Sequence, residues 1–117
     1  IEGDTLAVVA EGEASNQTTI TNDNSTASSD NSNEAPGAVY VYKRSGSTWT
    51  QEAYIKAANN GAQDYFGDMV SIDNGTLAVG VEREDSNQNT ITNGTSASSN
   101  NSNAESGAVY VYSFYEK

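Results

Sequence analysis

The chain contains no cysteine and no histidine among its 117 residues. Without cysteine there are no disulfide bonds and no thiolate nucleophiles, and without either residue the usual zinc sites and imidazole-based catalytic triads are excluded. Enzymatic chemistry would have to use carboxylates, hydroxyls and a few lysines. A non-enzymatic protein is therefore expected.

Basic residues are also scarce, because five Lys and Arg stand against 16 Asp and Glu, which gives a formal net charge of −11. Such a chain is repelled by nucleic acid and by anionic membrane surfaces, so neither is an expected partner, whereas cations fit the charge. No run approaches the roughly 20 apolar residues that span a bilayer, so no membrane insertion is expected. The first residue is Ile1 rather than Met, which favours a processed or excerpted sequence.

What the chain does contain is an internal repeat. The letters TLAV at 5–8 return at 76–79, and GAVYVY at 37–42 returns at 107–112, a period of about 70 residues. The repeat divides the chain into 1–57 and 58–117, with a long polar loop in each part, at 11–36 and at 82–106. Because single repeat units cannot bury their apolar faces alone, we expect something outside the chain to complete the core.

Short apolar runs predict strands. Residues 37–42 are apolar on both faces, which is typical of a strand covered on both sides, and 107–112 repeat this pattern. Residues 48–56 alternate, with Trp49, Ala53 and Ile55 expected on one face of a half-exposed outer strand. Residues 68–73 and 76–81 flank Asn74-Gly75, which predicts a hairpin with a type I′ turn. Nothing indicates a helix.

The strands carry a family resemblance. Tyr65-Phe66-Gly67-Asp68, GTLAVG at 75–80 and GAVYVY at 107–112 together resemble the FG-GAP repeat of integrin-α-like β-propellers, in particular bacterial-type surface proteins. The Gly-Ala-Pro element of that family reads Gly80-Val81-Glu82 here. The resemblance implies an all-β fold of antiparallel four-stranded propeller-like blades, of which this chain holds about one and a half repeats.

The same resemblance implies that each part of the chain is an incomplete blade. The first part lacks a strand equivalent to 68–73, and the second lacks one equivalent to 48–57. We expect these edges to be completed by neighbouring blades of a larger protein or by other subunits of a head-to-tail polymer, since unpaired edges accept further strands.

Carboxylates cluster where the two long loops begin, directly after predicted strands. Calcium prefers six to eight oxygen ligands, several of them anionic, so these carboxylates are candidate calcium ligands. A solvated acidic loop is the competing interpretation, and a glycosidase pair is disfavoured because no apolar surround is visible. The candidates are Glu11, Glu13, Glu82, Glu84 and Asp85.

The polar loops also hold most of the Asn-x-Ser/Thr sequons, which would place glycans on a secreted protein. Plain solubilising loops are the alternative. The candidate glycosylation sites are Asn16, Asn24, Asn74, Asn93 and Asn100.

The predicted function is that of a non-enzymatic, extracellular or cell-surface, structural or adhesive β-repeat module. It would be the subunit of a fibre built by strand sharing and decorated with glycans. The alternative is a calcium-dependent blade segment of a larger surface propeller that binds a protein or a carbohydrate. The expected partners are copies of the chain or adjacent blades, and an extracellular protein or glycan.

Overall fold

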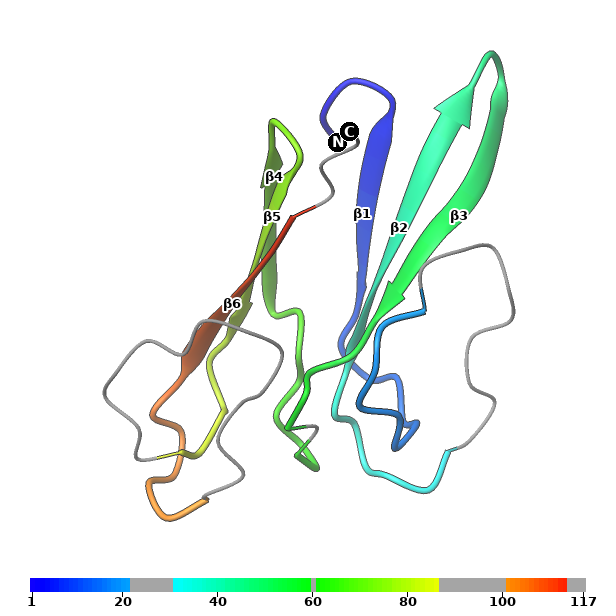
Figure 1. Ribbon diagram of the computed structural model, residues 1–117. Coiled ribbons are helices and arrows are strands. Elements are labelled where there is room, and N and C mark those ends of the chain that lie inside the picture. The colour runs from blue at the N-terminus through cyan, green and yellow to red at the C-terminus, as the bar shows by residue number, and fades with distance from the viewer. Residues whose placement is uncertain (22–30, 60, 87–100, 114–117) are drawn as a thin grey trace.

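The computed structural model describes residues 1–21, 31–59, 61–86 and 101–113, and this part of the chain forms two antiparallel sheets (Figure 1). The first sheet has the order β1-β2-β3 and the second the order β4-β5-β6. The predicted all-β fold is confirmed, and no helix occurs among the described residues, so none there could cross a membrane. The strands are β1 (Thr5–Ala10), β2 (Ala38–Ser45), β3 (Thr48–Ile55), β4 (Met69–Asp73), β5 (Thr76–Val81) and β6 (Ala108–Ser113).

The turn between β4 and β5 is the predicted one. Asp73 pairs with Thr76 across a two-residue loop, and Asn74 and Gly75 have φ angles of 45° and 76°. Positive φ at both central residues characterises a type I′ turn, whose twist matches that of the flanking strands. Near the N-terminus, Glu2 and Thr5 exchange two backbone hydrogen bonds across Gly3 and Asp4, so the chain begins with a two-residue turn at the equivalent position, in which Gly3 but not Asp4 has positive φ.

The prediction for β3 was wrong in two respects. Its register against β2 shifts between Val41 and Tyr42, because Glu52 forms a bulge, and the shift places Trp49 on the opposite face from Ala53. Trp49 shares a face with Arg44, whose guanidinium carbon lies 5.4 Å from the centroid of the indole ring. The strand is also not half exposed throughout: Ala53, Tyr54 and Ile55 are fully buried at its C-terminal end.

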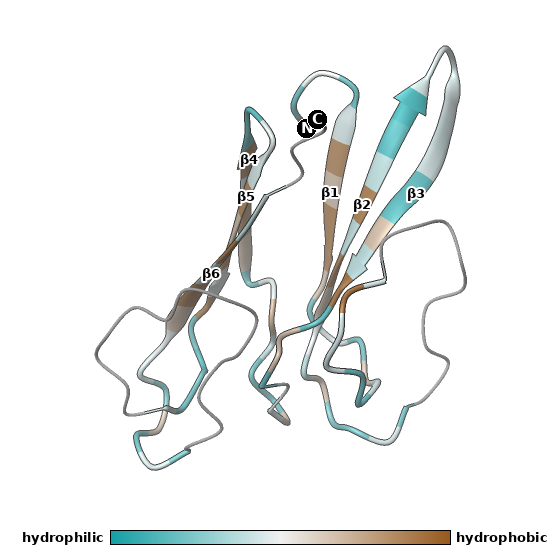
Figure 2. Ribbon diagram, in the orientation of Figure 1, coloured by the Kyte–Doolittle hydropathy of each residue, from teal (hydrophilic) through white to brown (hydrophobic). Residues whose placement is uncertain are grey.

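The two sheets stack face to face, and the core lies between them (Figure 1). Side chains alternate along each strand, so β2 turns Val39 and Val41 toward the second sheet. The second sheet contributes Leu77 and Val79 of β5 to the core, and Tyr110 and Tyr112 of β6 pack against this core. Figure 2 shows hydrophobic residues concentrated on the strands, whereas the end of β2 next to the β2–β3 turn is hydrophilic.

The segment between β3 and β4, residues 56–68, is the linker between the two sheets, and its Phe66 and Gly67 pack in the contact between them. Phe66 is fully buried, with its ring centroid 5.3 Å from that of Tyr110. A Cβ atom at Gly67 would lie 2.9 Å from Cγ1 of Val9, so the absence of a side chain here allows the linker to pack closely on the first sheet.

The linker also pairs with the end of the first loop. The amides of Gln63, Tyr65 and Phe66 donate hydrogen bonds to the carbonyls of three consecutive residues, Glu34, Ala35 and Pro36 respectively. A parallel bridge between Gly37 and Phe66 continues this contact. The linker therefore fastens the first loop where it returns to the sheet.

Candidate functional site

The candidate site consists of the two loop bases, the described segments that leave β1 and β5 and return to β2 and β6. Both loop bases lie at the same end of the molecule, opposite the hairpin turns (Figure 1). This placement follows from the repeat, because equivalent strands run in equivalent directions in the two stacked sheets. The predicted carboxylates lie in these segments.

The first loop base is built around Glu13. Its carboxylate accepts hydrogen bonds from the amide of Ser15 at 3.1 Å and from the hydroxyl of Ser15 at 3.2 Å. Nζ of Lys56, just beyond β3, lies 2.6 Å from Oε2 of Glu13 and donates to the carbonyl of Gly37 at 2.6 Å. The Lys56 side chain is 0% exposed and that of Glu13 is 13% exposed, so this is a buried ion pair.

The pKa values of both members of the pair lie below their ordinary values. Burial favours neutral Glu13, but the hydrogen bonds from Lys56 and Ser15 and the charge of Lys56 outweigh it, so the pKa of Glu13 lies below its ordinary 4.5. Burial lowers the pKa of Lys56 from its ordinary 10.5, and Glu13 opposes that shift. Tyr54 closes the cluster, with its hydroxyl 2.9 Å from that of Ser15.

The second loop base repeats this arrangement around Glu84. The amide and hydroxyl of Ser86 donate to Oε2 of Glu84 at 3.1 and 3.0 Å, and Glu84 is 2% exposed. Where Glu13 binds a lysine, Glu84 accepts a hydrogen bond from the amide of Asn59 at 3.0 Å, and Asn59 accepts one from the hydroxyl of Tyr110 at 2.5 Å. Among the described residues, only neutral groups bond to the carboxylate of Glu84.

The two loops are also closed by the same backbone hydrogen bonds. The carbonyl of Glu13 accepts a hydrogen bond from Gly37, and the carbonyl of Glu84 accepts one from Gly107. One residue further on, Ala14 and Asp85 each accept a hydrogen bond from an asparagine amide in the returning arm. Each loop therefore leaves and re-enters its sheet at a fixed point.

Negative charge gathers beside the second loop base. Asp64, in the linker, is 7% exposed, and its pKa rises from 3.8 to about 6 because of burial and the nearby charges of Asp85 and Glu84. At the first loop base, Lys56 neutralises the charge of Glu13, which is the repeat equivalent of Glu84. The second loop base thus carries negative charge without a bonded cation in the described part of the chain.

The structure separates the predicted calcium ligands. Glu11 and Glu82 are exposed, Glu13 is paired with Lys56, and Asp85 accepts a hydrogen bond from the amide of Glu105 at 2.6 Å. Within the described residues, no three Asp or Glu side chains are placed so that they could hold one metal ion. Calcium binding therefore remains a prediction.

Two of the predicted glycosylation sites can be located. Asn16 is exposed in the first loop base, and Asn74 is exposed in the turn between β4 and β5. The other three, Asn24, Asn93 and Asn100, lie outside the described residues.

Sequence reasoning missed the residues that bond to the two glutamates, Ser15, Lys56, Asn59 and Ser86, and the buried Asp64 whose charge lies near Glu84. One signal was available, because both loops begin with Glu-x-Ser, at 13–15 and at 84–86. The repeat of this triplet indicates a shared turn in which the serine bonds back to the glutamate. Nothing in the local sequence points to Lys56, which reaches Glu13 across 43 positions of the chain.

Comparison with known families agrees with this architecture. The FG-GAP repeat family matches residues 49–112, which is more than half of the chain and includes all of β3 but its first residue, the Phe66-Gly67 linker, and all of the second sheet but the last residue of β6. The chain belongs to the FG-GAP repeat family. Searches of curated proteins and of solved structures returned no match.

Membership of this family supports a β-propeller-like repeat module. FG-GAP repeats are generally non-enzymatic modules with structural or ligand-binding roles, and they are typically found in extracellular or surface proteins. The loop bases agree with a structural role, because their hydrogen bonds tie the loops to the sheets.

Proposed function

We propose that this FG-GAP chain is a non-enzymatic, extracellular structural or adhesive module, completed by further copies of its repeat and decorated with glycans on its polar loops. The observation that carries the proposal is the difference between the two loop bases. Lys56, at the end of β3, neutralises Glu13 beside β2, whereas Glu84 beside β6 is bonded only to neutral groups in the described part of the chain.

This difference predicts what the free edge of β6 would accept. The second sheet ends at β6 among the described residues, where the first sheet continues with β3. A strand of the β3 type placed antiparallel to β6 would complete a four-stranded blade and bring its lysine to Glu84. Backbone hydrogen bonds would supply affinity, and the buried charge pair would select the register.

A peptide tests this strand sharing. The probe is a synthetic peptide with the sequence of residues 48–58, TWTQEAYIKAA. Calorimetry should detect 1:1 binding to the intact chain. Either replacing the peptide lysine by methionine or introducing Glu84→Gln should weaken binding by about tenfold or more, since each leaves one buried charge unpaired. Equal binding by both peptides would contradict the proposed pairing, and no binding would contradict strand sharing.

The adhesive and glycan parts of the proposal concern the loops. Thr21 exchanges two backbone hydrogen bonds with Tyr54 of β3, so the part of the first loop that we expect to vary begins after Thr21. Replacing residues 22–30 by a Gly-Ser segment of equal length should keep the circular dichroism spectrum and change the free energy of unfolding by less than about 1 kcal/mol. Mass spectrometry of protein from its native source should find glycans at Asn16. Loss of folding on loop replacement would contradict a display role, and unmodified Asn16 would remove the glycan proposal at that site.

Calcium-dependent ligand binding is the alternative proposal. It is favoured by the charge of Asp85 and Glu84 around Asp64, which a bound cation would relieve. Calorimetric titration with calcium chloride should then release heat and raise the melting temperature, and Asp64→Asn should reduce both effects. No heat and no stabilisation at millimolar calcium would refute this alternative.

A further inference from the structure

The two sheets have equivalent faces because their strands are repeats. The face that is buried in the first sheet is exposed in the second. Val39 and Val41 of β2 are 0% exposed, because they face the second sheet. Their repeat equivalents on β6, Val109 and Val111, are 70% and 66% exposed. The sequence places apolar residues on this face in both sheets, and among the residues that the structure describes only the copy in β2 is covered.

The exposed residues form one apolar patch on the outer face of the second sheet. Met69, Gly80 and Val109 lie side by side on β4, β5 and β6. In the next row on the same face, Ala78 pairs with Val111. Met69 is 71% exposed. Contiguous apolar rows on an exposed sheet face are characteristic of interaction surfaces rather than of ordinary protein surface.

The chain also carries the complement of this patch. Inside the molecule, Leu77 and Val79 belong to the same buried core cluster as Val39 and Val41, and Tyr110 and Tyr112 pack against that cluster. The repeat equivalents of these four residues are Leu6, Val8, Tyr40 and Tyr42.

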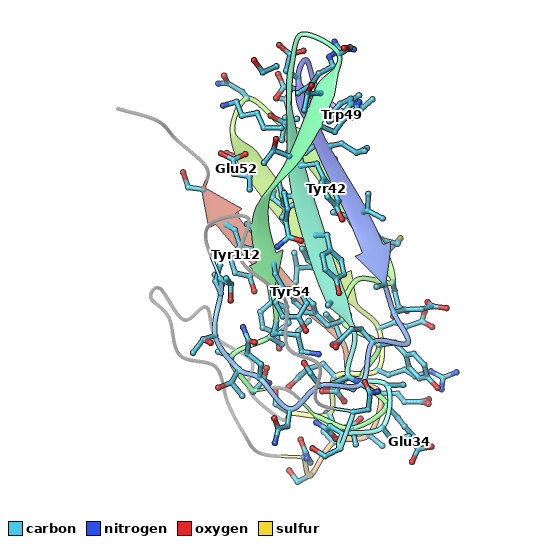
Figure 3. All side chains as sticks on the ribbon, turned by 90° about the vertical axis from the view of Figure 1, so that its right-hand side faces the viewer. Glu34, Tyr42, Trp49, Glu52, Tyr54 and Tyr112 are labelled. Carbon is cyan, nitrogen blue, oxygen red and sulfur yellow. The ribbon has the colours of Figure 1, made fainter. Side chains whose placement is uncertain are left out.

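These four equivalents share the outer face of the first sheet, where Leu6 pairs with Tyr42 and Val8 with Tyr40. Val8 is 40% exposed there, and Figure 3 looks onto this face, with Tyr42 near its centre. The first loop covers this face at Tyr54 of β3, while the part formed by β1 and β2 is of the kind that packs against the core within the chain.

We propose that the outer face of the second sheet docks onto the outer face of the first sheet of a second copy of this chain. Each contact of this kind would repeat the sheet-on-sheet packing seen inside the molecule. Because the two faces are different surfaces, the contact is heterologous and leads to head-to-tail association rather than to a closed dimer. The inference rests on the proposed structural role, but it uses sheet faces and not the edge of β6.

Charge opposes this association and provides a first test. Two copies with a net charge of −11 each repel one another, whereas the contacting faces are largely apolar. Raising the salt concentration screens the repulsion and leaves the apolar contact, so association should strengthen with salt. Sedimentation velocity over a range of protein and salt concentrations should show species larger than a dimer.

The polarity of the contact is tested with two variants. Val111→Asp places a charge on the outer face of the second sheet, and Val8→Asp places one on the outer face of the first sheet. Each variant alone should be monomeric, with the association constant reduced by about 30-fold or more. An equimolar mixture should form a 1:1 heterodimer and stop there, because each partner retains one functional face.

Both substituted side chains are partly exposed, so the variants should retain the circular dichroism spectrum of the parent chain. Val109→Asp repeats the test of the second sheet at an independent position, and Ile1→Asp, at an exposed apolar residue outside the strands, should associate like the parent chain. A monomeric parent chain at all concentrations and salts overturns the proposal, as does a mixture that remains monomeric. Dimers of Val8→Asp alone would also overturn it, because they indicate contact between identical faces. Failure of these tests leaves the peptide result at the β6 edge unaffected, so the two proposals can fail separately.

Discussion

Gly37 and Gly107 occupy equivalent positions at the ends of the two long loops, and substituting each by alanine isolates the contact that joins the sheets. Both have positive φ, +87° and +81°, so an alanine Cβ is strained at either position. At Gly107 the Cβ atom would meet nothing closer than 3.6 Å. At Gly37 it would lie 2.5 Å from the backbone nitrogen of Phe66 and closer still to its carbonyl oxygen.

The expected losses of stability follow from two effects, the positive φ at each glycine and the steric contact of the new Cβ atom with Phe66. Positive φ costs a residue with a Cβ atom about 1 to 2 kcal/mol, so Gly107→Ala should lower the free energy of unfolding by that amount. Gly37→Ala should lose about 1 to 3 kcal/mol more, because the opposing atoms belong to the backbone of Phe66 and cannot rotate away. Gly46→Ala, at φ +63° with open space around it, measures the conformational term alone.

Equilibrium urea unfolding followed by circular dichroism measures all three variants. Gly107→Ala and Gly46→Ala should be similar, and Gly37→Ala should be clearly the least stable. If Gly37→Ala and Gly107→Ala agreed within about 0.5 kcal/mol, the linker would not pack on Gly37 in solution, and the reasoning about how the sheets are joined would be refuted.

Three further substitutions test the loop bases and the hairpin turn. Lys56→Met should cost about 3 kcal/mol because it leaves the buried carboxylate of Glu13 unpaired, whereas Lys43→Met, at an exposed position, should change stability by less than about 0.5 kcal/mol. The lowered pKa of Glu13 means that the pair stabilises the fold above pH 4.5 and that this contribution is lost as the pH falls through the lower folded-state value, a loss that acid titration should not find in Lys56→Met. Asp64 has the opposite sign: its pKa rises from 3.8 to about 6, so the folded state binds the proton more tightly and stability falls as the pH rises through this window. Asp64→Asn should remove that slope and stabilise the chain at pH 7 by about 1 to 2 kcal/mol, as thermal melts at several pH values would show. Asn74→Ala should cost about 1 kcal/mol in urea unfolding because of its positive φ, and Asn74→Gly should be nearly neutral.

Strand positions and one turn could be predicted because their signals are local. Asn74-Gly75 specifies its turn through backbone conformation, and the apolar residues from Val39 to Tyr42 are typical of a strand wherever they occur. The face of Trp49 could not be predicted, because the bulge at Glu52 depends on how β3 pairs with β2. Alternation fixes the face of a side chain only while the register is unbroken.

The candidate site divides in the same way. The repeated Glu-x-Ser triplets lie in the sequence, and the bonds within each triplet span only two residues. The partner of Glu13 is Lys56, which strand pairing brings to it, and the partner of Glu84 is Asn59, which the linker brings to it. Contacts between distant residues depend on the fold, so no local pattern indicates them.

The sequence by itself determined that this protein is an all-β repeat with two long polar loops, because alternation, turn chemistry and the repeat are properties of the chain. Only the tertiary structure decided how the two copies differ. Val39 and Val109 have the same neighbours in sequence, yet one is 0% exposed and the other 70% exposed, since the second sheet covers the face that carries Val39. Burial depends on what lies opposite a residue in space, and the sequence of a repeat does not specify that.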